Sequence, residues 1–177
     1  MRIFIAVELP GAIRENIELL KADFRPVRGL RFVSTENIHI TLKFLGEVSD
    51  DKIKLVISAL KKVKFSPLKM SLGRIGVFPD EKNIRVLWVD AEPEEPLARL
   101  KEAIDAALPR FKDDHPFKSH ITIARVGMLS HDDKKRFIEL VANKHVAKKD
   151  FSVQKFTLFK STLTPGGPVY EKIAEFC

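Results

Sequence analysis

The sequence carries the tripeptide His-Ile-Thr twice, each time within a segment that alternates like a β-strand. The first segment is residues 36–46 (ENIHITLKFLG) and the second is residues 119–127 (SHITIARVG). Apolar residues occupy every second position, so each strand would bury one face. His39 and Thr41 then project from the other face of the first strand. His120 and Thr122 do the same in the second, so the sequence predicts two small polar sites on rigid elements.

The two motifs belong to a longer internal repeat. His39 and His120 are 81 residues apart, and a strand, a helix and a motif strand follow one another in both halves. The strand at residues 3–7 matches the strand at 84–89 at the same offset. We therefore expect residues 1–177 to form one α+β domain of two pseudo-symmetric halves. Packed about a twofold axis, these halves would bring the two histidine faces together across a cleft.

Periodicity and turn signals predict the remaining elements. The expected helices lie at residues 12–24, 49–63, 97–108 and 132–142. The expected further strands lie at residues 2–8, 30–33, 68–77 and 84–89. A closing pair of strands is expected at residues 151–163 and 169–176, joined by a Pro-Gly-Gly turn.

Composition indicates the kind of partner and the environment. Lysine and arginine number 31 against 24 acidic residues, and a net charge of +7 favours a polyanion such as RNA. Cys177 is the only cysteine, so neither an internal disulfide nor a cysteine-based zinc site can form. The apolar run near the N-terminus is too short for a signal or membrane segment. We expect a cytoplasmic protein that does not associate with a membrane.

Paired histidines and threonines without a metal suit hydrolysis of a phosphate ester. Imidazole serves as acid or base near neutral pH, while hydroxyl groups donate to the non-bridging phosphate oxygens. Lys43 and Lys118 share strand parity with the motif histidines and would add positive charge. Arg125 comes five residues after His120, so it reaches the same face only through a bulge, a twist or the end of the strand.

Other site chemistries are disfavoured. Each motif offers one histidine without a carboxylate at a metal-site spacing, so no metal and no cofactor is expected. The other three histidines, His115, His131 and His145, are expected to be surface or capping residues.

The segments HITLKFLG and HITIARVG, together with the opening RIFIAVELP, resemble the two-histidine phosphoesterase superfamily. Within it, they are similar to the RNA 2′,3′-cyclic phosphodiesterases, also called 2′-5′ RNA ligases. The resemblance implies a bilobal α+β fold with antiparallel sheets lining a central cleft and helices outside. It also implies metal-independent opening of RNA 2′,3′-cyclic phosphates to 2′-phosphomonoesters.

The resemblance further implies roles for individual residues. His39 would be the acid that protonates the 3′ leaving oxygen, and His120 the base that acts on water. Thr41, Thr122 and Arg125 would bind the phosphate. We expect a monomer acting on RNA ends, including tRNA halves, with 2′-5′ joining as a side reaction. The alternatives are a phosphodiesterase of small nucleotides (2′-5′ oligoadenylate, ADP-ribose cyclic phosphate) and a non-catalytic RNA-end-binding module.

Overall fold

The structure, a computed structural model, describes residues 1–112 and 115–177. Its strands are β1 (Arg2–Glu8), β2 (Leu30–Phe32), β3 (His39–Glu47), β4 (Leu68–Phe78), β5 (Val86–Glu92), β6 (His120–Val126), β7 (Asp150–Val153), β8 (Phe156–Thr164) and β9 (Gly167–Phe176). Its α-helices are α1 (Gly11–Phe24), α2 (Asp50–Leu60), α3 (Glu94–Ala107) and α4 (His131–Asn143).

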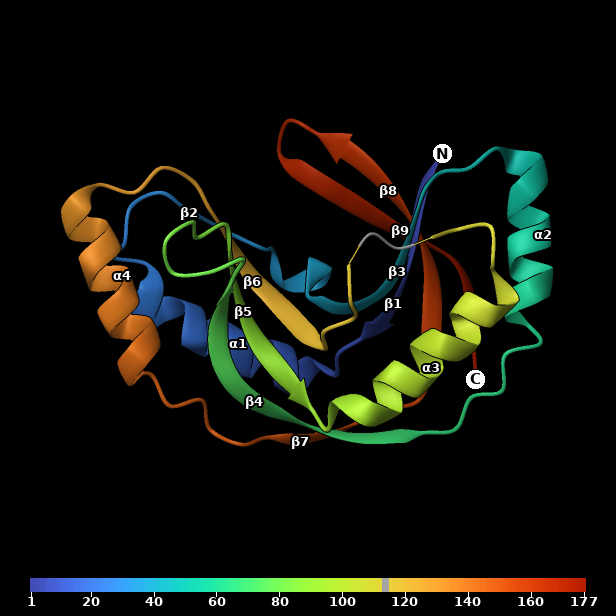
Figure 1. Cartoon of the computed structure of the whole chain (residues 1–177), viewed down its shortest axis with the longest axis horizontal. Helices are drawn as coiled ribbons and strands as arrows, with labels where there is room; N and C mark the ends of the chain where they lie inside the picture. The colour runs from blue at the N-terminus through green and yellow to red at the C-terminus, as the bar shows by residue number, and fades with distance from the viewer. Residues whose placement is uncertain (113–114) are drawn as a thin grey trace.

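The strands form one antiparallel sheet made of two halves. Their order is β7-β4-β5-β6-β3-β1-β8-β9, with β2 added beside β6. The halves meet where β3 and β6 come together, and the register there records a single residue pair, Ile40 with Ile121. Figure 1 shows the sheet curling around this junction, with α1 and α4 at one end and α2 and α3 at the other. The predicted α+β class with two halves is confirmed.

The two faces of the sheet have different environments. The face that packs against the helices holds the main core, which includes Ile5, Ile40 and Ile121, all fully buried. The other face carries both motif histidines and a small separate cluster of Phe4, Ala6 and Phe159 with Tyr170. Alternation along each strand sorts side chains to the two faces.

Each half of the sheet contains strands from both repeats. β4 follows α2 along the chain but pairs with β5, whereas β8 follows α4 and pairs with β1. Neither repeat therefore forms a complete half-sheet from its own strands.

The predicted strand at residues 151–163 is wrong as a single element. It consists of β7, which pairs with β4, and β8, which pairs with β1 in the other half. Gln154 and Lys155 link the two strands. Local periodicity is the same on both sides of this link, so it does not reveal that the chain changes its partner.

The repeat offset also differs between strand pairs. Glu8 lies opposite His39, and Asp90 lies opposite His120, so β1 and β5 correspond at an offset of 82 residues. The predicted match of Ile3 with Ile84 is therefore wrong by one residue. A one-residue slip would move every side chain of the strand to the opposite face.

Candidate active site

The two motifs meet at the junction between the halves. Ile40 and Ile121 are Cα partners in an antiparallel pair and both point into the core. Their neighbours, His39 and Thr41 on β3 and His120 and Thr122 on β6, therefore lie on the opposite face. Antiparallel geometry sets His39 across from Thr122 and Thr41 across from His120. The motifs were predicted to come together where the two halves meet, and they lie side by side there on the neighbouring strands β3 and β6.

Each histidine is held by the same kind of hydrogen bond. The Nδ1 atom of His39 lies 2.6 Å from the Asn37 carbonyl oxygen, and that of His120 lies 2.7 Å from the Lys118 carbonyl oxygen. A carbonyl oxygen only accepts, so Nδ1 must be the protonated nitrogen in both rings. This fixes the tautomer and leaves Nε2 as the atom that accepts or releases a proton.

The Nε2 atom of His39 points to its own motif threonine. It lies 2.9 Å from the Thr41 hydroxyl oxygen. A base or acid and a hydroxyl donor therefore converge on one point at the open face, which is the arrangement that phosphate chemistry requires.

Aromatic rings fix the orientation of both imidazoles. Phe4 and Tyr170 lie against His39, with ring centroids 5.1 and 5.4 Å away. Phe78 lies edge-on to His120 at 4.9 Å, and Trp88 is 6.5 Å away. These contacts remove water from the ring edges, so they influence protonation as well as geometry.

Both imidazoles are harder to protonate than a free histidine. Burial lowers the pKa of His39 to about 4, and the charges of His120 and Arg14 act in the same direction, against the hydrogen bond to Asn37. Burial also lowers the pKa of His120, although the charges of Asp90 and Glu94 oppose that shift. In the free protein both rings are therefore neutral at pH 7.

A carboxylate stands across the strand ladder from each histidine. Glu8, opposite His39, forms ion pairs with Lys172 at 2.9 Å and with Arg14 at 3.8 Å. Asp90, opposite His120, is 2% exposed and forms ion pairs with Lys118 and Arg74. The sequence reasoning missed this symmetric pair. Alignment of β1 with β5 at an offset of 82 residues would have matched Glu8 with Asp90.

A bulge in each motif strand changes which side chains reach the open face. The pairing of β6 with β5 shifts by one residue between Thr122 and Ala124, and β3 shifts in the same way between Thr41 and Lys43. The residue five positions after each histidine therefore lies on the histidine face. Arg125 occupies this position in β6 and Phe44 in β3, and both are exposed. The bulge that Arg125 needs in order to reach the histidine face is therefore present in β6.

The expected place of Lys43 beside the motif is wrong, and the bulge is the reason. Strict alternation would have kept this lysine on the face of His39. Instead, Lys43 is 2% exposed, and its ammonium group lies 2.7 Å from the Asp105 carboxylate on α3. Lys43 therefore joins a strand to a helix on the core side.

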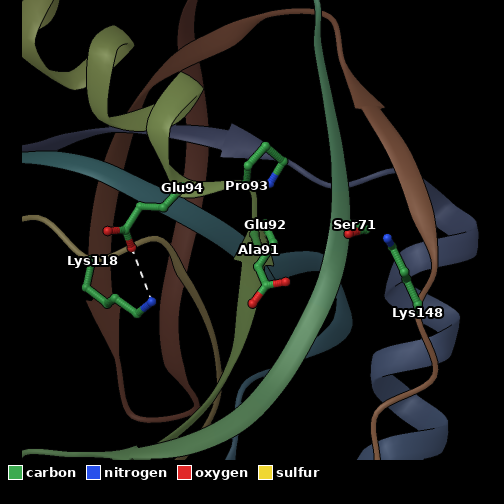
Figure 2. A pocket seen from close by; sticks show the side chains of 7 residues that line it. All are labelled: Ser71, Ala91, Glu92, Pro93, Glu94, Lys118 and Lys148. Atoms are coloured by element: carbon green, nitrogen blue, oxygen red, sulfur yellow. Dashed lines mark ion pairs between the residues drawn. The ribbon is translucent and has the colours of Figure 1, made fainter.

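Lys118 lies beside the site, as its parity suggested, but carboxylates compensate its charge. Its ammonium group is 2.8 Å from Asp90 and 3.2 Å from Glu94, and it sits 5.8 Å from the Trp88 ring centroid. Burial lowers the pKa of Lys118, but the hydrogen bonds to Asp90 and Glu94 outweigh it, so the net shift is upward. Lys118, Glu94 and Lys148 line a hollow of about 440 Å³. Figure 2 shows Lys118 and Glu94 at one side of this hollow and Lys148 at the other.

The remaining histidines lie on the surface, as predicted. His131 is the first residue of α4, and His115 and His145 are exposed in loops. In the part of the chain that the structure describes, no three histidine, cysteine or acidic side chains gather as a metal site would need. None of the described helices combines the length and apolar character needed to cross a membrane.

Comparison with known proteins identifies relatives over the whole chain. The family described as LigT like Phosphoesterase matches twice, at residues 7–88 and 89–170. The RNA 2′,3′-cyclic phosphodiesterase of Methanocaldococcus jannaschii is 37% identical over 99% of this chain and 100% of the relative.

Solved structures give the same result. The crystal structure of TT0787 of Thermus thermophilus superposes with a TM-score of 0.83 at 30% identity, covering 99% of this chain and 97% of that one. E. coli LigT complexed with 3′-AMP superposes with a TM-score of 0.78 at 26% identity, covering 98% and 95%.

Proposed function

This chain belongs to the LigT-like phosphoesterases, and we propose that it hydrolyses the 2′,3′-cyclic phosphate at RNA ends to a 2′-phosphomonoester. One observation carries the proposal. Two His-Ile-Thr motifs meet on one open face, and both imidazoles are anchored through Nδ1, an arrangement that leaves both Nε2 atoms available for proton transfer. The names of the relatives, which cover the full length of the chain, support the same substrate.

His39 and His120 form the acid–base pair of the proposed reaction. One imidazole takes a proton from water through Nε2 while the water oxygen bonds to phosphorus. The bond between phosphorus and the ribose 3′ oxygen breaks. The other imidazole, protonated at the start, gives its Nε2 proton to that oxygen. Relief of the strained five-membered ring assists this cleavage.

Thr41, Thr122 and Arg125 act on the phosphate in this proposal. The threonine hydroxyls donate to the non-bridging oxygens, and the guanidinium group offsets the charge that develops on them. Replacing either threonine by valine keeps its shape but removes a donor. That loss should cost about 1–3 kcal/mol, shared between binding and turnover.

The free protein is not yet in the required protonation state. Burial keeps both imidazoles neutral near pH 7, whereas the reaction needs one of them charged. A bound phosphate anion favours the charged form of a neighbouring imidazole, so binding of the substrate should itself promote protonation of one histidine. The pH profile of kcat/KM should be bell-shaped.

Two observations point to opposite answers to the question of which histidine is the acid and which is the base. The resemblance implies that His39 is the acid and His120 the base. The charges of Asp90 and Glu94, however, favour the protonated form of His120, and no carboxylate contributes in this way at His39. A diester with a p-nitrophenyl leaving group separates the roles, because that group departs without a proton. The variant that lacks the acid should keep most of its activity on this substrate, and the variant that lacks the base should not.

The main test uses an oligoribonucleotide with a 2′,3′-cyclic phosphate end in the presence of EDTA. We expect a 2′-phosphomonoester product and full activity in the chelator. His39→Ala and His120→Ala should each lower kcat by about 10²–10⁴ while RNA still binds. The double variant should be barely worse than either single one, because the pair acts as a unit. Activity that is lost in EDTA and restored by zinc would overturn the mechanism.

The same assay distinguishes the proposed function from the two alternatives. A small-nucleotide phosphodiesterase would prefer 2′-5′ oligoadenylate or ADP-ribose cyclic phosphate over RNA, and an end-binding module would bind without turnover. Joining of tRNA halves through a 2′-5′ bond would appear as a longer RNA product. We also propose that one chain acts alone as a single functional domain, because β3 and β6 of the same chain complete the site.

A further inference from the structure

Two arginines stand directly opposite each other beside the site. β2 pairs with β6 so that Arg31 and Arg125 are Cα partners. Side chains of directly opposed residues in an antiparallel pair lie on the same face, with Cβ atoms about 5 Å apart. Opposed like charges destabilise a strand pair, so this arrangement needs a reason.

Arg31 and Arg125 lie on the face of the motif histidines. The neighbours of Arg31 in β2, Leu30 and Phe32, pack against the main core, so Arg31 points the other way. The bulge in β6 brings Arg125 to the same open face. Along β6, Arg125 lies about 7 Å beyond Thr122, since the bulge shortens the path to about two strand steps.

The backbone fixes the register of β2 and therefore the position of Arg31. Gly29 has φ +88°, a conformation that suits glycine, and a Cβ there would lie 2.6 Å from the Met128 carbonyl oxygen. The Gly127 amide donates to the Gly29 carbonyl at 2.9 Å, and the Val33 amide donates to the Ile123 carbonyl at 3.0 Å. Hydrogen bonds at both ends of β2 therefore hold Arg31 against Arg125.

Among the described residues, neither of these two arginines has a carboxylate partner, whereas three other cations near the site do. Lys118 and Arg74 pair with Asp90, and Lys172 pairs with Glu8. Within residues 1–112 and 115–177, neither Arg31 nor Arg125 forms an ion pair or a side-chain hydrogen bond. Both are exposed, so an anion from solution can reach them.

The charge of Arg125 also reaches across the opening between the halves. Burial raises the pKa of the Tyr170 hydroxyl on β9, while the charges of Arg125 and Arg2 act in the opposite direction. Tyr170 itself lies against His39. Because Arg125 also lies about two strand steps from Thr122 on the histidine face, it can serve a substrate held between the two histidines, and Arg31, its partner on β2, lies on its outer side. In Figure 1, β2 and β6 run together at the end of the sheet nearest α4.

We propose that Arg31, held beside Arg125, forms a second anion site that binds the internucleotide phosphate next to the cyclic end, while Arg125 serves the cyclic phosphate itself. This inference rests on the proposed function, and it makes the preferred substrate an oligoribonucleotide and not a cyclic mononucleotide. The equivalent of Arg125 in the other repeat is the apolar Phe44, so among the described residues this opposed arginine pair has no counterpart at the equivalent place on β3. The RNA strand consequently leaves the site in one direction, over β6 and β2.

The test compares two substrates in the wild type and in Arg31→Gln. One is a 2′,3′-cyclic mononucleotide, and the other is a dinucleotide that carries the same cyclic end. Arg31→Gln should lower kcat/KM for the dinucleotide about tenfold, the loss of one charged phosphate contact, and should leave the mononucleotide unchanged. The dependence of log Kd for an oligonucleotide on log salt should become shallower by about one unit.

Two controls isolate the phosphate contact. Arg99→Gln removes an exposed arginine that is paired with Glu95 on α3, and it should behave as wild type on both substrates. A dinucleotide with a neutral methylphosphonate linkage should lose the advantage in the wild type, and Arg31→Gln should then have no further effect.

The outcomes distinguish this inference from the proposed function. Suppose that the wild type turns over the mononucleotide and that Arg31→Gln loses the same factor in kcat/KM on both substrates. This result would overturn the second anion site and leave the proposed function standing. No turnover of either substrate by the wild type would overturn the proposed function. Thermal unfolding at low salt gives a readout without substrate, because removing one of two opposed charges should keep or raise Tm. A large fall in Tm would show that Arg31 serves the fold.

Discussion

At the scale of single residues, the site is defined by what each imidazole nitrogen can do. Backbone carbonyls hold Nδ1 of His39 and of His120, so the free protein presents Nε2 of both rings to the open face. Burial of both rings lowers their pKa values. The same burial that orients these groups also links their protonation to the stability of the fold.

That link predicts a loss of stability at acidic pH. The pKa of His39 is about 4 in the folded protein and 6.5 in an unfolded chain. Between these values the unfolded chain binds a proton that the folded chain does not, so stability falls as pH falls from 6.5 to 4. His39 contributes at most about 3.4 kcal/mol to this change, at about 1.4 kcal/mol for each unit of pKa. His39→Gln should flatten the fall, as measured by urea unfolding at several pH values.

The matched control is His145→Gln, which removes an exposed imidazole. Its stability profile should follow that of the wild type, including the part that the carboxylates contribute. A profile of His39→Gln parallel to that of the wild type between pH 4 and 6.5 would show that His39 is not buried in its neutral form.

At the scale of secondary-structure elements, the two bulges decide which residues serve the site. The bulge after each motif threonine exchanges the faces of the residues that follow it directly, and β3 shifts register a second time between Phe44 and Gly46. Lys43 is thereby turned to the core side, where it pairs with Asp105, and Arg125 is turned to the open face. A bulge inside a ladder is a local irregularity that is typical of strands next to active sites.

The bulges predict opposite effects for two substitutions. Lys43→Met should lower the free energy of unfolding by about 1–3 kcal/mol, because it removes a charged hydrogen bond in a buried setting, and should change kcat/KM less than about twofold. Arg125→Gln should do the reverse, keeping stability and lowering kcat/KM by tenfold or more. Urea unfolding and steady-state kinetics on both variants provide the test. Impaired turnover with unchanged stability in Lys43→Met would contradict the placement of Lys43.

At the scale of the whole molecule, the exchange of strands ties the two repeats together. One half-sheet needs β8 and β9 from the C-terminal part of the chain, and the other needs β4 from the N-terminal part. The sequence contains two repeats, but neither repeat corresponds to an independent folded unit. Unfolding should therefore be a single cooperative transition in spite of the two-halved shape.

Cutting the chain in the turn between β4 and β5 tests this interdependence. Fragment 1–81 lacks β8, which pairs with β1, and fragment 82–177 lacks β4, which pairs with β5. Each fragment should therefore be largely unfolded alone. Mixing them should restore the far-ultraviolet circular dichroism of the intact protein and its activity. Cooperative unfolding of fragment 1–81 by itself would contradict the strand exchange.

Much of the site could be predicted from sequence because its signals are local. Each His-Ile-Thr motif spans only three residues and ends before the bulge in its strand. Strand alternation therefore assigns the face of all four functional side chains correctly, which are His39, Thr41, His120 and Thr122. The doubling of the motif indicated that the four belong together, and the structure places them side by side. Most element positions were also correct, since helical and strand periods are properties of short segments.

The tertiary structure alone decided the partners, the register and everything beyond the bulges. Nothing local distinguishes β7 from β8, and yet the two lie in different halves because each completes a different buried surface. The match of Glu8 with Asp90, the burial of Lys43 and the opposition of Arg31 to Arg125 all depend on how one strand registers against another. Register is set by which faces must be buried across the whole sheet, so long-range packing determines it and the period of any single strand does not.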